Sequence, residues 1–240
     1  MKYLILFLFI ICALVGLSQL IPKHDDEKEL IVGTNAEYPP YTFIENGKIT
    51  GFDIDVANLI CQKLEKEMLL VDMPFDALLP QLQMNQIDFI AAGITKTEER
   101  AKKVLFTKPY LTGDPLVIVS RVPVDLTKLK SLTIVVNEGY HADVYASSID
   151  GLEMIRLPAP ADALFALQSQ RADGFITALS TAKNLGKDYF ISEPLGDASD
   201  PVSLAISNKH PELLSEIEVA LEEMIFDGSL DELKKKWGFQ

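Results

Sequence analysis

Cysteine and histidine are scarce in this chain, which has two cysteines and three histidines among its 240 residues. A structural zinc site needs four clustered ligands, and the spacing of these few residues suggests none. Basic residues are also in deficit, because 22 Lys and Arg stand against 35 Asp and Glu and leave a net charge of −13. This charge disfavours nucleic acid and anionic membrane surfaces as partners. We therefore expect no metal, no cofactor and no nucleic-acid partner.

Common enzyme motifs are missing as well. The sequence contains no GxSxG, no GxGxxG after a strand, no GxxxxGK followed by Ser or Thr, and no HExxH. Their absence removes the usual signatures of serine hydrolases, dinucleotide enzymes, P-loop proteins and zinc proteases. The composition, with 48% hydrophobic and 24% charged residues, is that of a globular protein and excludes a disordered or fibrous chain.

The N-terminus has the layout of an export signal. A single lysine, Lys2, precedes an unbroken run of apolar or small residues over 4–17, and the small Ser18 is suited to cleavage after it. The run is shorter than the about 20 residues of a membrane span, although an uncleaved anchor stays open. We expect a signal peptide or N-terminal anchor over 1–21, a solvated spacer over 22–29, and a periplasmic location.

After the spacer, strand and helix patterns alternate and then start again. The first series runs from residue 30 to Gly113, with an amphipathic helical pattern from Asp53 onward. The second series begins after Gly113, and two helical stretches over 211–226 and 230–237 end the chain. Such alternation is typical of a parallel sheet covered by helices on both faces, and the restart predicts two lobes.

Four segments resemble, in order and spacing, the family 3 bacterial extracellular solute-binding proteins, the polar amino-acid receptors of ABC importers. They are GTNAEYPPY at 33–41, GFDIDVA at 51–57, IDFIAAGITKTEER at 87–100, and NKHPELL at 208–214 with DGSLDELKKKWGF at 227–239. The resemblance implies the α/β fold of type II periplasmic binding proteins. In that fold, two lobes of mainly parallel sheet with flanking helices are joined by two crossover hinge strands. It implies a first lobe of 30–113 plus 204–240 and a second lobe of 114–203.

The resemblance also implies where the ligand's carboxylate binds. The family residues that match Arg100 and Thr95 bind the α-carboxylate, and the match to Gly93 contributes a backbone contact. An arginine is suited to this role because its rigid guanidinium donates two parallel hydrogen bonds to one carboxylate. The alternative for Arg100 is a surface ion pair with Glu98 or Glu99.

Further positions come from the same match. Tyr38 and Phe52 match an aromatic pair that encloses the ligand's side chain, although both rings could instead be ordinary core. Asn35 matches a position near the ligand that is often Asp. In the second lobe, the loop with Asn137 and His141 is expected to touch the ligand, and a solvated helix start is the alternative for His141.

The second lobe departs from the family pattern. Ala178 stands where members that bind α-amino acids commonly carry an acid for the ammonium group, and a buried ammonium without a counter-charge costs several kcal/mol. Glu138 could supply the charge, the pocket could stay wet, or the ligand could lack the amino group. Tyr140 and His141 also replace smaller residues, which predicts a narrow cleft. We expect a dicarboxylic or neutral amino acid rather than a basic one.

These patterns are interpreted as a receptor and not an enzyme. It is expected to act as a monomer that binds an amino acid or related carboxylate between its lobes and delivers it to an ABC permease in the membrane. Two alternatives stay open. One is a dehydratase of cyclic carboxylates with His141 or Glu138 as general acid, and the other is a ligand-binding sensor domain.

Overall fold

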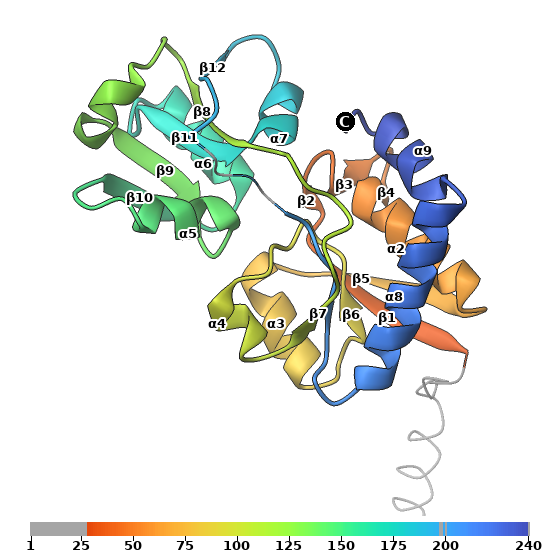
Figure 1. The fold of residues 1–240 in the computed structure, drawn as a ribbon. Helices are drawn as coiled ribbons and strands as arrows, with labels where there is room; N and C mark the ends of the chain where they lie inside the picture. The colour runs from red at the N-terminus through yellow and green to blue at the C-terminus, as the bar shows by residue number, and fades with distance from the viewer. Residues whose placement is uncertain (1–27, 197–198, 200, 240) are drawn as a thin grey trace, which may run out of the picture.

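A computed structural model describes residues 28–196, 199 and 201–239. The predicted leader over 1–21 and most of the spacer over 22–29 lie outside the described residues. Figure 1 shows two lobes, with the middle of the chain in one of them and both ends of its described part in the other. No helix in the part of the chain that is described is long and apolar enough to cross a membrane.

The first lobe is built on a five-stranded sheet with the strand order β5-β1-β6-β13-β7. Its strands are β1 (Glu29–Thr34), β5 (Glu67–Asp72), β6 (Phe89–Ile90), β7 (Leu105–Phe106) and β13 (Ala205–Ile206). Strand β1 pairs in parallel with β5 and β6, whereas β13 pairs antiparallel with β6 and β7. The chain therefore returns to this lobe after building the other one.

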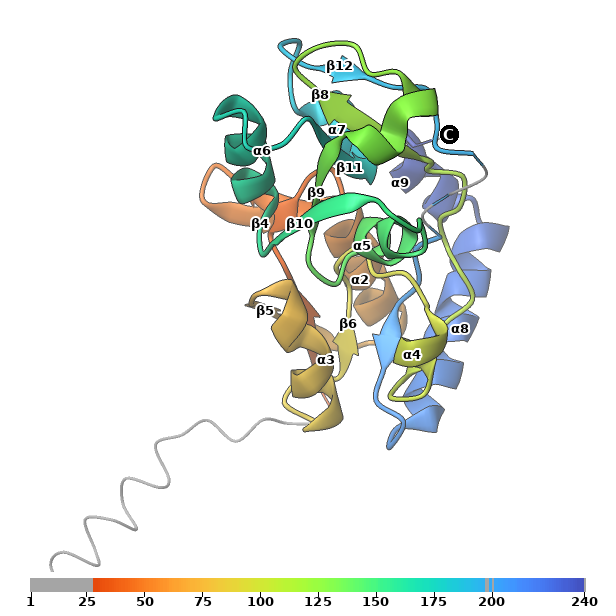
Figure 2. The same cartoon turned by 90° about the vertical axis from the view of Figure 1, so that its left-hand side faces the viewer.

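Helices and a small hairpin sheet complete the first lobe. The hairpin sheet contains β2 (Glu37–Tyr38), β3 (Thr42–Glu45) and β4 (Lys48–Thr50), and Asn46-Gly47 forms the predicted turn. The helices are α2 (Phe52–Lys63), α3 (Phe75–Gln83), α4 (Glu98–Ala101), α8 (Pro211–Phe226) and α9 (Ser229–Lys236). Both views show α8 and α9, in blue, running along the first lobe (Figures 1 and 2).

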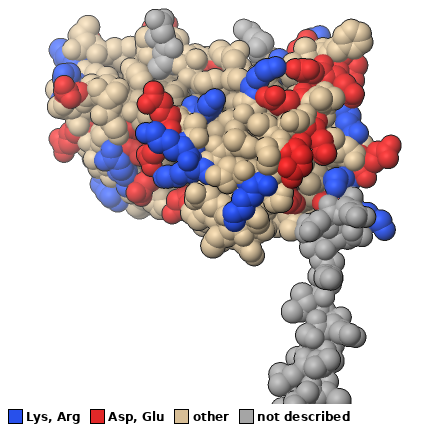
Figure 3. All heavy atoms as spheres, turned by 60° about the horizontal axis from the view of Figure 1, so that its bottom comes forward, with Lys and Arg blue, Asp and Glu red and all other residues tan. Residues whose placement is uncertain are grey.

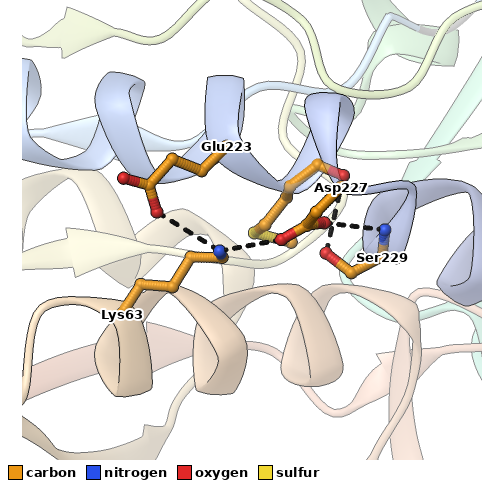
Figure 4. Close-up of polar contacts among 5 residues, drawn as sticks. Lys63, Glu223, Asp227 and Ser229 are labelled. Carbon is orange, nitrogen blue, oxygen red and sulfur yellow. Dashed lines mark hydrogen bonds and ion pairs between the residues drawn. The ribbon is translucent and has the colours of Figure 1, made fainter.

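A charged junction ties α2 to the turn between α8 and α9. The Lys63 ammonium lies 3.2 Å from a Glu223 oxygen and 3.0 Å from an Asp227 oxygen (Figure 4). Hydrogen bonds from the Ser229 hydroxyl and N–H, together with Lys63, hold the pKa of Asp227 at about 2. The carboxylate is therefore ionised at neutral pH, and it accepts a hydrogen bond at 2.9 Å from Ser229 N–H at the start of α9.

Elsewhere, charged side chains of both signs are interspersed on the surface, as the face in Figure 3 shows. Exposed pairs include Lys103 with Glu99 at 2.7 Å and Lys108 with Glu222 at 3.1 Å. Water and salt screen such pairs, so they contribute little stability. The lobes are stabilised mainly by their apolar cores.

The second lobe contains a sheet with the order β10-β9-β11-β8-β12. Its strands are β8 (Leu116–Ser120), β9 (Thr133–Asn137), β10 (Glu153–Leu157), β11 (Gly174–Ala178) and β12 (Phe190–Ile191), and its helices are η1 (Leu126–Ser131), α5 (His141–Ser147), α6 (Pro160–Gln168) and α7 (Leu179–Asn184). Successive residues of β8 enter two different cores, with Val117 on one face and Leu116 and Ile118 on the other. This explains why the strand reads as a continuous apolar run.

Two crossover segments join the lobes and pair with each other. Tyr110 N–H donates to Val202 O at 3.0 Å, and Val202 N–H donates to Leu111 O at 2.9 Å. The predicted two-lobed α/β fold with two crossovers is confirmed, but each sheet is mixed rather than mainly parallel. The chain runs in opposite directions along the two crossovers. The strands next to the crossovers therefore run antiparallel to their neighbours in each sheet. The residue bounds given above for each lobe stay a prediction.

Candidate ligand-binding cleft

The predicted site residues gather where strands of both sheets end. Asn35 follows β1, Gly93 lies just beyond β6, and Asn137 is the last residue of β9. Ligands of open α/β sheets bind outside the carboxyl ends of parallel strands. Hydrogen bonds between side chains at these ends cross from one lobe to the other, so the strand ends of the two lobes face each other across a cleft.

Arg100 lies inside this cleft. Helix α4 begins at the Thr97 cap, whose hydroxyl accepts from Arg100 N–H at 3.2 Å and so fixes the start of the helix. The Arg100 side chain donates through Nη1 to Thr95 O at 2.8 Å and through Nη2 to Gly139 O of the opposite lobe. Its guanidinium carbon lies 5.4 Å from the centre of the Phe75 ring. A buried, fork-shaped cation is suited to a carboxylate.

The aromatic residues of the cleft differ from those predicted. Phe52 is fully buried, with its ring 4.8 Å from the Phe239 ring and 5.8 Å from the Tyr110 ring, so it belongs to the core beneath the cleft. Phe75, at the start of α3, holds the position beside Arg100 instead. No sequence motif points to Phe75, because it lies at the start of α3, shortly after the end of β5, and only the fold brings it beside Arg100.

Two tyrosines link the lobes across the cleft. The Tyr38 hydroxyl lies 3.1 Å from the Thr177 hydroxyl and accepts from Ala178 N–H at 3.3 Å. The Tyr140 hydroxyl donates to Asn35 Oδ1 at 2.9 Å. The sequence predicts only that Tyr140 is larger than the residue usual at this position in the family. Its role as a bridge between the lobes is not evident from the sequence.

The other second-lobe candidates support the loop after β9. Asn137 is buried and donates through Nδ2 to Leu157 O at 3.2 Å, which anchors the end of β9 to β10. His141 begins α5, where burial and the nearby Arg100 lower its pKa, so the imidazole is neutral at pH 7. It lines a cavity of about 570 Å³ together with Thr95 and Lys96. Contact of these residues with a ligand stays a prediction.

A second opening of the cleft is acidic. A cavity of about 160 Å³ beside Phe75 is lined by three exposed carboxylates, Glu37, Asp76 and Glu138. The two openings thus differ in charge, since the other one is lined by Lys96 and by no carboxylate of the described residues. No cluster of three or more His, Cys, Asp or Glu that could hold a metal ion occurs within the described ranges.

Asp114 is a further residue that sequence reasoning missed. It lies on the first crossover, where it accepts from the Tyr41 hydroxyl at 2.5 Å, from Ser180 N–H at 3.0 Å and from the Ser180 hydroxyl at 2.6 Å. One carboxylate therefore joins the first lobe, the crossover and the start of α7. This arrangement fixes how the lobes meet at the hinge.

Gly93 is held from below by Asp53. Its N–H donates to Asp53 Oδ2 at 2.5 Å, so a ligand contact at Gly93 would fall to the carbonyl oxygen. A Cβ at this position would lie 3.3 Å from the Tyr41 ring, and its φ is +61°. Burial raises the pKa of Asp53 to about 7, more than the hydrogen bond from Gly93 lowers it.

Asp53 is expected to make stability depend on pH. Between its ordinary pKa of 3.8 and about 7, the folded state keeps a proton that the unfolded state has lost. Rising pH therefore favours unfolding over this range, by up to about 4 kcal/mol, and the effect stops above pH 7. Asp53→Asn, which mimics the neutral acid, is expected to remove this slope. Urea unfolding of both proteins from pH 4 to pH 8 measures how the free energy of unfolding depends on pH. The same pH dependence in both proteins would contradict the raised pKa of Asp53.

Comparison with known proteins identifies the family. The model of the bacterial extracellular solute-binding proteins, family 3, matches residues 30–240. The chain belongs to this family. It is 30% identical to the probable ABC transporter arginine-binding protein ArtJ of Chlamydia trachomatis, covering 99% of this chain and 96% of that one. It is 31% identical to the arginine-binding extracellular protein ArtP of Bacillus subtilis, covering 88% and 86%.

Solved structures of family members have the same architecture. The arginine-binding protein ArgBP of T. maritima, as its P235GK mutant, matches with a TM-score of 0.80 and 36% identity over 87% of this chain and 94% of that one. AncCDT-1, an ancestral amino acid-binding protein and a precursor of cyclohexadienyl dehydratase, matches with a TM-score of 0.78 and 31% identity, covering 87% and 94%. The chain is thus a solute-binding protein in both sequence and fold.

Proposed function

We infer that the protein is the exported receptor of an ABC importer and that its ligand is a basic amino acid, with arginine as the first candidate. The single observation that carries this inference is Arg100, a buried guanidinium in a cleft whose far opening is acidic. The relatives named as arginine-binding in two bacteria support the same ligand class. This revises the expectation of a dicarboxylic or neutral amino acid, which rested on the cations Arg100 and His141 and on the acids missing at Asn35 and Ala178.

The charge pattern suits a ligand with a carboxylate at one end and a cation at the other. The carboxylate would bind Arg100 and Thr95, because a guanidinium can donate two parallel hydrogen bonds to one carboxylate. The cationic side chain would lie along Phe75 toward Glu138 and its acidic neighbours, since a guanidinium stacks well on an aromatic face. Glu138 was among the candidates to replace the acid missing at Ala178.

Lobe closure would couple binding to transport. A ligand shifts the balance between open lobes and lobes closed around it only as far as it binds the closed arrangement more tightly. Contacts from one lobe cannot supply that preference, because they exist in both states. Arg100 in the first lobe and the loop after β9 in the second together offer contacts that only the closed form makes. The closed form would then dock on the permease.

Thermal unfolding against a ligand panel tests this function. The panel contains arginine, lysine, histidine, glutamine, glutamate and a prephenate-like cyclic carboxylate, added to protein produced in an exporting bacterial host. Ligand at about a hundred times its Kd adds about 2.7 kcal/mol, which raises the Tm by roughly 5–10 °C. We expect the largest rise with arginine. A rise with glutamate alone would contradict the basic ligand, and consumption of the cyclic carboxylate would favour the dehydratase.

The acidic opening gives a matched control. Glu138→Gln is expected to weaken arginine binding about twofold to fivefold at low salt, with less effect at high salt, because an exposed charge is screened. Glu216→Gln removes an equally exposed carboxylate from α8 and is expected to leave the affinity unchanged. Equal affinities for the two variants would show that the acidic opening does not face the ligand.

A further inference from the structure

Tyr140 lies at the centre of the cleft, between the aromatic residues of the opposite lobe. Its ring centre is 4.4 Å from that of Phe75 and 5.2 Å from that of Tyr38, the latter in an edge-on arrangement. The side chain is only 7% exposed. Phe75 is the ring along which the proposed function places the ligand's side chain, and the family resemblance gives Tyr38 the same role. Tyr140 therefore fills the space in which that side chain would lie.

Its hydroxyl is also engaged by the opposite lobe. It donates to Asn35 Oδ1 at 2.9 Å, and Asn35 is held in turn by the hydrogen bond from its Nδ2 to Met73 O at 3.2 Å. The position of Asn35 often carries an acid in the family, whereas the amide here accepts from a phenol. The neutral amide and the phenol are complementary without any charge. Burial raises the pKa of Tyr140, so the hydroxyl stays protonated and remains a donor.

The residue before Tyr140 engages the carboxylate site as well. Gly139 O accepts a hydrogen bond from Arg100 Nη2. Gly139 has a φ of +77°, and its N–H donates to Asp143 Oδ2 at 3.1 Å, so α5 holds the turn in place. Gly139 thus binds the Arg100 guanidinium, and Tyr140 fills the space between the rings of Phe75 and Tyr38. Together they occupy both parts of the proposed site.

We propose that Tyr140 is a built-in competitor of the ligand, which closes the cleft by occupying it and must swing out before a solute can bind. The proposal rests on the proposed function for the identity of the solute, but closure by Tyr140 can be measured without any solute. A receptor of which only a fraction is open to ligand shows an affinity reduced by that fraction. Tyr140 therefore sets the solute concentration at which the receptor fills.

Replacing Tyr140 is expected to change the affinity in the opposite direction from replacing an ordinary ligand-binding residue. Removing a residue that contacts the ligand weakens binding, whereas removing a competitor strengthens it. If the occupied cleft makes up about 90–99% of the molecules, its loss raises the affinity about 10- to 100-fold. The affinity rises because more of the ligand-free protein has an accessible cleft, so the contacts with the ligand need not change.

The test compares Tyr140→Ser with Tyr140→Phe. The serine variant removes the ring, whereas the phenylalanine variant keeps the ring and removes only the hydrogen bond to Asn35. Small-angle scattering in amino-acid-free buffer measures the radius of gyration, and calorimetric titration measures the affinity for arginine. We expect a larger radius and an affinity raised at least about tenfold for Tyr140→Ser. The gain for Tyr140→Phe should be about fivefold, the value of one neutral hydrogen bond.

The outcomes separate this proposal from the proposed function. An unchanged radius with weaker arginine binding in both variants would overturn the proposal, because Tyr140 would then be a wall of the site. A larger radius for Tyr140→Ser without arginine binding to any protein would support closure by Tyr140 and overturn the arginine ligand. Ser147→Ala, at the exposed last residue of α5 and outside both openings of the cleft, controls for changes in α5 and is expected to leave both measurements unchanged.

Discussion

Replacing Arg100 with alanine is expected to weaken arginine binding by about two to three orders of magnitude, the largest effect of any single change in the cleft. The buried guanidinium is proposed to hold the ligand's carboxylate through two charged hydrogen bonds. Loss of one partner of such a pair costs about 2–5 kcal/mol, because the other charge is left in the cleft without compensation. Calorimetric titration with arginine, at protein concentrations that can detect millimolar binding, measures the loss.

Two further variants make the result specific. Arg100→Lys keeps the positive charge but lacks the planar fork, so we expect an affinity between those of the parent and the alanine variant. Arg121→Ala removes an exposed arginine that donates to Gln168 O in the second lobe, and it is expected to bind normally. Arginine binding within threefold of the parent in Arg100→Ala would rule out Arg100 as the carboxylate partner. The prediction would then fail even if the protein binds amino acids.

The fold could be predicted largely because its strongest signals are local. The strand pattern that starts again after Gly113 arises from β8 and β9, which are continuous apolar runs because both faces of each strand are covered. The last long helix begins at Pro211 and ends at Phe226, as its proline and the following Asp-Gly indicated. The strand β10 gives no comparable signal, because it lies at the sheet edge and carries Glu153 and Arg156, which break the apolar pattern.

The site was harder to predict because it depends on contacts between distant segments. Arg100 could be proposed from its motif, and the structure does put it in the cleft. The motif that contains Phe52 predicts a ring beside the ligand, whereas Phe52 is buried in the core beneath the cleft. The position of Tyr140 depends on how closely the lobes approach each other. No local pattern encodes that distance, so only the folded chain reveals the bridge to Asn35.

The same motif leads to the largest expected effect on stability, at Gly51. Its φ is +139°, and a Cβ there would lie 2.1 Å from Tyr41 O and 2.6 Å from Tyr41 C, both rigid backbone atoms. The neighbouring Phe52 and Asp53 N–H groups bond to Pro40 O at 2.9 Å and Tyr41 O at 3.0 Å, so the two segments cannot separate without losing hydrogen bonds. We expect Gly51→Ala to lose about 3–5 kcal/mol of unfolding free energy from strain and overpacking combined.

Gly47→Ala is the matched control for this prediction. Gly47 also has a positive φ, of +75°, but no atom lies within 4 Å of the Cβ that alanine would add. Its cost is therefore the backbone conformation alone, about 1 kcal/mol. Urea unfolding monitored by circular dichroism compares the two variants, and equal losses would mean that the approach to Tyr41 is not tight. Because Tyr41 stacks on Tyr38 at 5.4 Å, Gly51→Ala should also weaken ligand binding, whereas Gly47→Ala should not.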